Sequence, residues 1–139
     1  MKFSRHDVRQ VFARTLWGEA RGQGTAGMRV VACVILNRDA DRNKHFGQSI
    51  LDICLAPRQF SCWNWDDANH WPVEHVTDRD PQYRMALDVV EEALTGCLKD
   101  TTHGANYYLS HGARRPVWLH NAVFLGTQHR FDLYKMAVP

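Results

Sequence analysis

The chain has no long apolar run and little excess of charge of either sign. A membrane-spanning helix needs about twenty consecutive apolar residues, so we expect no membrane insertion. The formal net charge of the 139 residues is only +2 with the histidines neutral. That excess is too small for an electrostatic nucleic-acid binder, and we expect no nucleic-acid partner. The N-terminus turns polar at once and lacks the apolar core of a signal peptide, which predicts synthesis in the cytoplasm without a signal sequence.

Short motifs for metal binding and thiol redox chemistry are also missing. None of the cysteines belongs to a Cys-x-x-Cys pair, so neither a zinc knuckle nor a thioredoxin-type site is indicated. The eight histidines are scattered and form no His-Glu-x-x-His motif. We therefore expect no metal and no cofactor. Reduced thiols are the default for a protein made in the cytoplasm, with a pair of disulfides as the alternative. The cysteines are Cys33, Cys54, Cys62 and Cys97.

No repeat, low-complexity segment or linker divides the chain, so residues 1–139 are predicted to form a single domain. Apolar residues first recur at helical spacing, and beyond Gly96 short alternating segments with glycine turns indicate strands. The predicted fold class is α+β, a mainly helical domain with a small antiparallel sheet near the C-terminus. Helices are predicted over 4–17 and 25–38, from Ser49 to before Pro57, and from Asp80 to Gly96; strands are predicted over 105–109, 117–120, 122–125 and 129–134.

Residues 58–77 follow no regular pattern, yet they hold four large aromatic side chains. Loops are normally polar, so these aromatics need a specific explanation. Aromatic faces stack well on the apolar faces of sugar rings, which favours a carbohydrate-binding groove. Plugs that hold the loop on the core are an equal alternative. The four side chains are Phe60, Trp63, Trp65 and Trp71.

Glu19 is an acid on the apolar stripe of the first predicted helix. At about 100° per residue it projects roughly 20° from Val8, which belongs to that stripe. Ser4 and Asp7 are predicted to form the capping box that starts this helix. Partial burial and the negative end of the helix both disfavour a charged carboxylate, so we expect a raised pKa, as a general acid requires. The alternative is a surface glutamate at a frayed helix end or one paired with a nearby arginine.

Three blocks of the sequence carry motifs that point to a known family. Residues 14–38 read RTLWGEARGQGTAGMRVVACVILNR, an acid in a G-E-A-R-G setting followed by a buried helix that ends in N-R. Residues 57–64, PRQFSCWN, contain a Q-F-S segment. The third block has Gly-Ala at 104–105, Pro-x-Trp at 116–118 and GTQHRF at 126–131. Together, and in this order, the blocks resemble the SleB-type cell-wall hydrolase family, which includes spore-cortex-lytic enzymes and catalytic domains from phages.

The resemblance implies a lysozyme-like fold and a peptidoglycan substrate, with the glycan strands as the partner. Glu19 matches the family's catalytic acid, and its implied role is general acid and base in cleavage of the MurNAc–GlcNAc bond. One acid without an evident carboxylate partner favours a lytic transglycosylase, in which the muramic acid 6-hydroxyl attacks the anomeric carbon. A hydrolytic muramidase is the alternative and needs a second carboxylate. The candidates for it are Asp39, Asp41, Asp66 and Asp67.

The matched blocks also imply a set of residues that bind the substrate. Several of them have a structural role as the alternative: loop capping for the polar ones and core packing for Tyr108. Many relatives carry histidines where this chain has Tyr107 and Leu109, so no role of those histidines is carried over. The candidate substrate-binding residues are Gln59, Phe60, Ser61, Trp63, Asn64, Asn106, Tyr108 and His129.

Other functions fit parts of the sequence less well. A thiol amidase or peptidase would use Cys62 as its nucleophile, but no helix N-terminus is evident there to lower the pKa of the thiol. A zinc amidase or peptidase needs a ligand set that the scattered histidines do not supply. A non-enzymatic wall-binding module would rest on the aromatic loop and has no need for Glu19. The candidate bases for the thiol enzyme are His111, His120 and His129.

The sequence also leads to an expectation about where the enzyme acts. Without a signal peptide, the protein is expected to reach the cell wall in the periplasm after release, as a phage endolysin does through a holin lesion. Carriage on a phage-like particle and export by other means are the alternatives. We expect a monomer.

Overall fold

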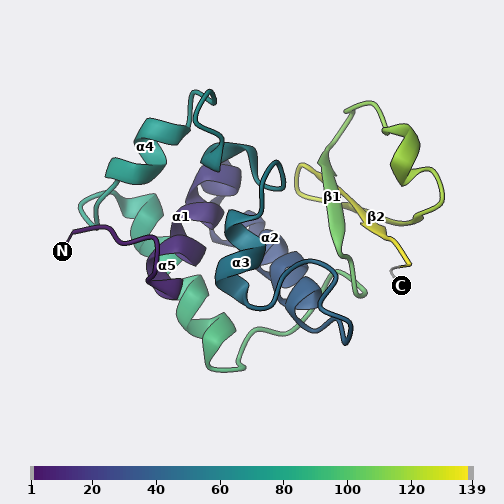
Figure 1. Ribbon diagram of the computed structural model, residues 1–139, viewed down its shortest axis with the longest axis horizontal. Coiled ribbons are helices and arrows are strands. Elements are labelled where there is room, and N and C mark those ends of the chain that lie inside the picture. Colours follow the sequence, from purple (N-terminus) through teal and green to yellow (C-terminus); the bar gives the residue numbers. More distant parts are fainter. Residues whose placement is uncertain (1, 138–139) are drawn as a thin grey trace.

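The computed structural model describes residues 2–137. Helices form the first part of this range, and a three-stranded sheet follows near the C-terminus (Figure 1). The predicted α+β class is confirmed. The helices are α1 (Val8–Ala20), α2 (Gly24–Asp39), α3 (Ile50–Leu55), α4 (His70–His75) and α5 (Pro81–Leu94); the strands are β1 (Tyr107–Ser110), β2 (Val123–Gln128) and β3 (Phe131–Lys135); single 3-10 turns are η1 (Arg21–Gln23), η2 (Ser61–Trp63) and η3 (Val117–Leu119).

Helix α1 begins later and ends later than the sequence predicts. Its N-cap is Asp7, whose carboxylate accepts from the backbone N–H groups of Arg9 and Gln10 at 3.0 and 3.2 Å. Ser4 bonds instead to the N–H of His6 at 3.2 Å, outside the helix. The predicted start at Ser4 is therefore wrong, because a carboxylate at Asp7 satisfies the free N–H groups of the first turn. The later end keeps Glu19 inside the helix.

Two further segments differ from their predicted structure. The expected strand at 117–120 is the 3-10 turn η3, because the guanidinium of Arg115 donates to the carbonyls of Leu119 and Ala122 and curls this segment into a loop. Residues 58–77, expected to be irregular, contain η2 and α4. Pro72 lies in the first turn of α4, where a missing N–H costs no helical hydrogen bond.

The strands pair in the order β1-β3-β2, antiparallel throughout. In this register Tyr108 lies opposite Leu133, and Ser110 lies opposite Phe131. The end of β1 therefore lies beside the turn that joins β2 to β3.

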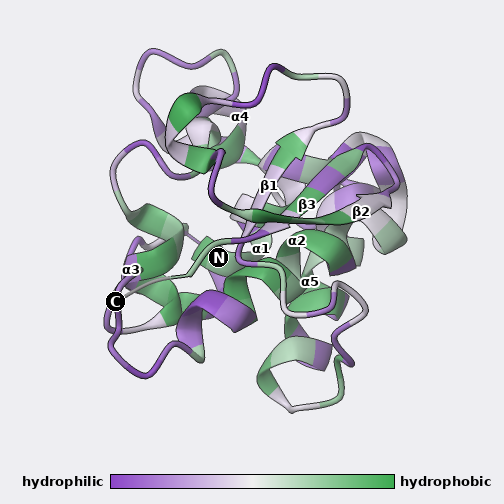
Figure 2. Ribbon diagram, turned by 90° about the vertical axis from the view of Figure 1, so that its right-hand side faces the viewer, coloured by the Kyte–Doolittle hydropathy of each residue, from purple (hydrophilic) through white to green (hydrophobic). Residues whose placement is uncertain are grey.

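The hydrophobic core lies among α1, α2, α3 and α5, with α1 in contact with all the others. Val11, Phe12 and Leu16 of α1 are completely buried. Figure 2 colours the central helices largely as hydrophobic and the loops around α4 mainly as hydrophilic. This packing fixes α1 as the rigid support of Glu19.

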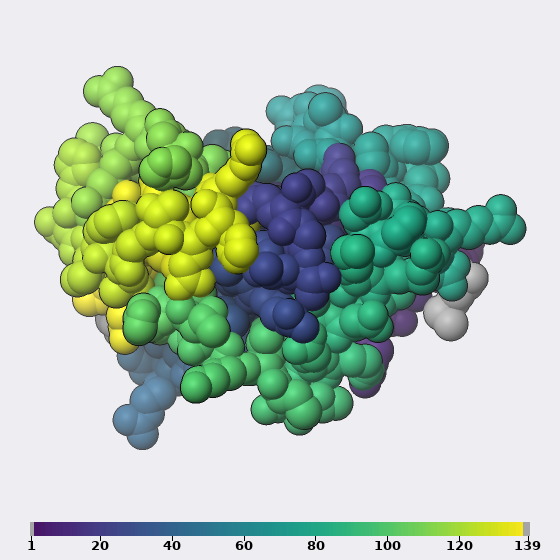
Figure 3. Space-filling model, turned by 180° about the vertical axis from the view of Figure 1, so that it is seen from behind, coloured from purple at the N-terminus to yellow at the C-terminus, as the bar shows by residue number. Residues whose placement is uncertain are grey.

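The end of α2 fastens the sheet to the helical part. The buried guanidinium of Arg38 donates from Nε to the carbonyl of Asn106 at 2.7 Å, immediately before β1. The side-chain amide of Asn37 donates to the carbonyl of Ala105 at 2.9 Å. From behind, the C-terminal strands (yellow) lie against the dark-blue surface of residues near 20–40 (Figure 3). Helix α2 therefore sets the position of the sheet.

Two further observations concern the cysteines and the helix lengths. All four cysteines lie in the described range and none forms a disulfide. Within residues 2–137, no helix has the length and apolarity needed to cross a membrane. Three of the thiols are buried, those of Cys33, Cys54 and Cys62, and that of Cys97 is exposed.

Candidate active site

Glu19 lies in the last turn of α1, where the helix end faces the C-terminal sheet. Its half-buried side chain lines a pocket of about 380 Å³. The rest of the lining comes from η1, from the end of β1 and from the turn before β3. These residues are Gln23, Ser110, His111, Arg130 and Phe131.

The surroundings of Glu19 raise the pKa of its carboxyl, as the apolar stripe predicted. Burial is the main cause, because it penalises the charged form. Tyr108 donates its hydroxyl to Oε1 of Glu19 at 2.5 Å. This bond and those from Cys62 favour the charged form and partly offset the rise, whereas the negative charge of Asp67 adds to it. The result is a carboxyl that keeps its proton to a higher pH than an exposed glutamate, which is the direction a general acid requires.

Gly18 allows η2 to approach α1 beside Glu19. A Cβ at position 18 would lie 2.8 Å from Cβ and Sγ of Cys62 and 2.9 Å from Cγ2 of Val73. These distances are too short for real carbon contacts, so only glycine fits without displacing η2 or α4. The close approach places the Cys62 thiol against the Glu19 carboxyl.

The structure places the residues of the Q-F-S block in different surroundings. Phe60 and Trp63 are buried, with 1% and 8% of their surfaces exposed. Trp63 donates its indole N–H to Thr15 Oγ1 at 2.9 Å, so it anchors η2 to α1. Gln59 is exposed and accepts a long 3.4 Å hydrogen bond from Arg38. Ser61 is exposed as well, and none of the five candidates, which include the half-buried Asn64, lines the Glu19 pocket.

The candidates from the C-terminal block separate into one that meets Glu19 and two that do not. Tyr108 makes the hydrogen bond to Glu19 described above. Asn106 is buried and bonds with both amide atoms to the backbone of Met136, at 2.9 and 2.8 Å, so its side chain extends the pairing of the C-terminal strands. His129 lies in the turn between β2 and β3 with a positive φ of 54°. Of the eight candidates, only Tyr108 is bonded to Glu19.

The sequence did not identify the wall of the pocket that lies across from Glu19. His111 had been considered only as a base for Cys62, and Gln23, Ser110, Arg130 and Phe131 had no individual role. The pairing of Ser110 with Phe131 brings these residues together. That register depends on long-range contacts, so no local signal in the sequence identifies this wall.

The exposed tryptophans are not the ones assigned to the substrate. Trp65 is 85% exposed and Trp71 is 67% exposed, and Trp71 stacks on His75 with ring centroids 4.1 Å apart. Phe60 and Trp63 are therefore core plugs, whereas Trp65 and Trp71 lie on the surface. Trp65 lies two residues beyond η2, the element that carries Cys62.

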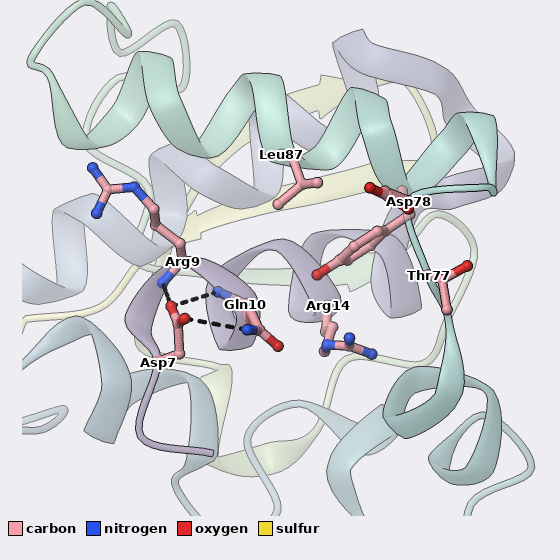
Figure 4. Close-up of a pocket in the computed structure, with 8 residues that line it drawn as sticks. Asp7, Arg9, Gln10, Arg14, Thr77, Asp78 and Leu87 are labelled. Carbon is pink, nitrogen blue, oxygen red and sulfur yellow. Dashed lines mark hydrogen bonds between the residues drawn. The ribbon is translucent and has the colours of Figure 1, made fainter. Parts of the chain in front are cut away.

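A second pocket, of about 330 Å³, lies between the first half of α1 and α5 (Figure 4). Its lining includes Asp7 and Arg14 but not Glu19. At about 100° per residue, Arg14 and Glu19 point roughly 140° apart around α1. Asp7 caps α1, and the buried Arg14 donates to the carbonyl of Val73 at 2.6 Å. The polar groups of this pocket therefore stabilise the fold.

The geometry around Cys62 does not suit a thiol nucleophile. The side chain is completely buried, and burial together with the neighbouring Glu19 raises the pKa of the thiol. A protonated, inaccessible thiol is a poor nucleophile. Among residues 2–137, no group of three or more His, Cys, Asp or Glu side chains is arranged to hold a metal ion.

A carboxyl with a raised pKa that lines a pocket is chemically able to act as a proton donor. The family model for cell wall hydrolases matches residues 22–131, and the chain therefore belongs to this family of cell-wall-degrading enzymes. The matched segment begins just after Glu19. A search of curated proteins found no match.

Two solved structures have the same fold. One is the catalytic domain of the Bacillus cereus SleB protein, with a TM-score of 0.71 and 24% identity over 92% of this chain and 89% of that chain. The other is the catalytic domain of the germination-specific lytic transglycosylase SleB from Bacillus anthracis, with a TM-score of 0.71 and 24% identity over 96% and 97% of the two chains. The chain thus has the fold of SleB catalytic domains.

Proposed function

We propose that the chain is a lytic transglycosylase that cleaves the bond between N-acetylmuramic acid and N-acetylglucosamine, with Glu19 as general acid and base. The observation that carries this proposal is the Glu19 carboxyl itself, which lines a pocket, has a raised pKa and accepts a hydrogen bond from Tyr108. Membership of the cell wall hydrolase family supports the substrate, and the similarity to the Bacillus anthracis lytic transglycosylase supports the reaction type.

In the proposed mechanism, Glu19 acts twice. Tyr108 occupies Oε1, so Oε2 carries the proton and gives it to the oxygen of the departing N-acetylglucosamine as the glycosidic bond breaks. Positive charge develops on the anomeric carbon of the muramic acid. The 6-hydroxyl of the same sugar then attacks that carbon, and its proton passes to the Glu19 carboxylate. The 1,6-anhydro product forms and Glu19 is again protonated.

Mass spectrometry of the products tests this proposal. Purified peptidoglycan digested by the wild type is expected to carry 1,6-anhydromuramic ends. Glu19→Gln keeps the size of the side chain but cannot donate a proton, so its rate is expected to fall by a factor of about 10² to 10⁴. Unchanged product from Glu19→Gln would exclude Glu19 as the acid.

A hydrolytic muramidase is the second candidate, and one observation favours it. Among the candidate carboxylates, Asp67 is the one whose negative charge contributes to the rise in the pKa of Glu19. Its Oδ1 already accepts from the backbone N–H of Asn69 at 2.8 Å. Reducing ends in the product, together with their loss in Asp67→Asn, would favour hydrolysis with Asp67 as the second carboxylate.

We further propose that the enzyme acts as a phage endolysin and works as a monomer. The action of its family on the cell wall supports a lytic role. Expression inside bacteria is expected to leave the cells intact until the inner membrane is permeabilised, and then to lyse them. Light scattering of the purified protein measures its oligomeric state.

A further inference from the structure

The wall of the Glu19 pocket that faces the carboxyl is built from polar residues of the sheet. Ser110 and His111 come from the end of β1, and Arg130 comes from the turn between β2 and β3. The backbone N–H of His111 donates to the carbonyl of Arg130 at 2.8 Å, which fixes the two residues side by side. The wall is therefore a defined structure and not a pair of free loops.

The imidazole of His111 has a fixed orientation. Its Nδ1 lies 2.8 Å from Oδ1 of Asp132, which also accepts the hydroxyl of Thr127 at 2.7 Å. An ionised carboxylate has no proton to donate, so Nδ1 carries the proton of this bond, and in that neutral tautomer Nε2 is left to accept a hydrogen bond from a ligand N–H or O–H group. The side chain of His111 is 66% exposed, whereas that of Asp132 is only 14% exposed. Asp132 thus orients the ring, and the ring is accessible.

The main chain at Arg130 is also held in place. Its backbone N–H donates to Oε1 of Gln23 at 3.0 Å, which joins the turn to the start of α2. Gln23 can occupy this position because Gly27 has no side chain; a Cβ there would lie 2.5 Å from Cβ of Gln23. The exposed guanidinium of Arg130 forms no ion pair or hydrogen bond within residues 2–137.

The charges of the pocket leave one cation without compensation. Burial disfavours the charged form of the Glu19 carboxyl, and the Asp132 carboxylate is already occupied by Thr127 and His111. Arg130 is therefore the free charge of this wall, and a planar guanidinium matches a carboxylate with two parallel hydrogen bonds.

We propose that Arg130 forms a subsite for a carboxylate carried on the lactyl arm of the muramic acid, with Nε2 of His111 beside it as an acceptor for an N–H or O–H group of the same sugar. This inference rests on the proposed function and identifies the part of the glycan that the enzyme recognises. The sugar rings themselves are uncharged, and only the lactyl arm or the peptide attached to it supplies carboxylates. Such a subsite distinguishes muramic acid from N-acetylglucosamine, which lacks the arm.

Calorimetric binding to the inactive Glu19→Gln protein tests the subsite apart from catalysis. The ligands are a peptide-free muramyl tetrasaccharide with free lactyl carboxylates, the same tetrasaccharide with its carboxylates amidated, and a peptide-bearing tetrasaccharide. Adding Arg130→Gln is expected to weaken binding of a carboxylate-bearing ligand about tenfold, the equivalent of one charge-assisted hydrogen bond, and to leave binding of the amidated ligand unchanged. Arg130→Lys is expected to retain part of the affinity.

The two carboxylate sources give different patterns. Weaker binding of the peptide-free ligand assigns the subsite to the lactyl carboxylate, and weaker binding of only the peptide-bearing ligand assigns it to the peptide. Equal loss for the amidated ligand, or no loss for any ligand, would overturn the proposal. Arg42→Gln removes the same charge from an exposed loop outside the pocket and is the matched control. Turnover by the wild type reports separately on the proposed function.

Discussion

Two opposing influences act on the carboxyl of Glu19. Burial raises its pKa, and the hydrogen bond from Tyr108 works in the other direction because a phenol that donates to the carboxyl stabilises its charged form. The same bond holds Oε1 at a fixed place at the end of α1. Tyr108 therefore both positions the acid and limits how far its pKa rises.

Tyr108→Phe separates these two effects. The change keeps the ring, which packs against Phe131 with centroids 4.8 Å apart, but removes the hydroxyl. We expect the pKa of Glu19 to rise further, so the alkaline limb of the pH–rate profile moves to higher pH. We expect kcat to fall about tenfold at the optimum because the carboxyl is less well held. A profile that keeps its shape while kcat falls would show that Tyr108 does not affect the proton of Glu19.

The stability of the protein should also depend on Glu19. A carboxyl whose pKa is higher in the folded than in the unfolded protein favours folding most at low pH, and this advantage is lost as the pH rises from the unfolded pKa through the folded pKa. Glu19→Gln does not titrate. We therefore expect it to melt at a higher temperature than the wild type at pH 8, with a smaller difference at pH 4. A difference that is the same at both pH values would contradict a raised pKa in the folded state.

The residues of the site differ in how far the sequence alone identified them. Helical periodicity placed Glu19 on the apolar stripe but left a surface role open, and the match to the G-E-A-R-G motif is what implied its role as the acid. Tyr108 was a candidate because it lies in the matched C-terminal block. Trp63 and Trp65 could not be distinguished, since two tryptophans in one irregular segment give no pattern that shows which is buried. Arg130 was missed because its partner in the pocket lies on a different strand.

At the scale of elements, the helices were predictable and the segment between α3 and α5 was not. Helix α5 begins at Pro81 after the cap Asp80, as the sequence predicts. Segments η2 and α4 are each too short for a periodic signal, and their positions depend on contacts with α1. At Gly18 this contact leaves no room for a Cβ, so it should determine both the stability of the protein and the geometry of the site.

Gly18→Ala tests the contact between α1 and η2. The added Cβ would force Cys62 or Val73 to move, and we expect unfolding to become easier by about 1–3 kcal/mol. We expect activity to fall as well, because Cys62 lies against Glu19. Urea denaturation and kcat are the measurements. Gly22→Ala adds a methyl group where no atom lies within 4 Å, so this matched control should change both quantities little.

At the scale of the whole molecule, a buried cation joins the helical part to the sheet. Arg38 has only 3% of its surface exposed, and it lies over the rings of Phe46, Phe60 and Tyr107. Its bond to the carbonyl of Asn106 holds the chain at the point where it enters β1, two residues before Tyr108. The position of Tyr108 relative to Glu19 therefore depends on a residue outside the pocket.

Arg38→Met tests this connection. Methionine fills much of the same space but leaves the buried Asn106 carbonyl without its donor, and we expect a loss of about 1–3 kcal/mol in the free energy of unfolding. The catalytic rate should also fall, because β1, which carries Tyr108, is then held less firmly. Arg29→Met, on the same helix, breaks only the surface ion pair with Glu92 and should cost less than about 1 kcal/mol. Equal effects of the two variants would argue against the role of Arg38.

Only one of the four thiols, that of Cys97, is exposed, so the folded protein should react with a thiol reagent at a single position. Burial raises the pKa of Cys33, of Cys54 to about 12, and of Cys62, so these three should resist alkylation while the protein is folded. A maleimide is therefore expected to attach once, at Cys97 just beyond α5, and four times after unfolding in urea. A fluorophore at that position would follow the protein on the wall from outside the Glu19 pocket, whose lining does not include Cys97.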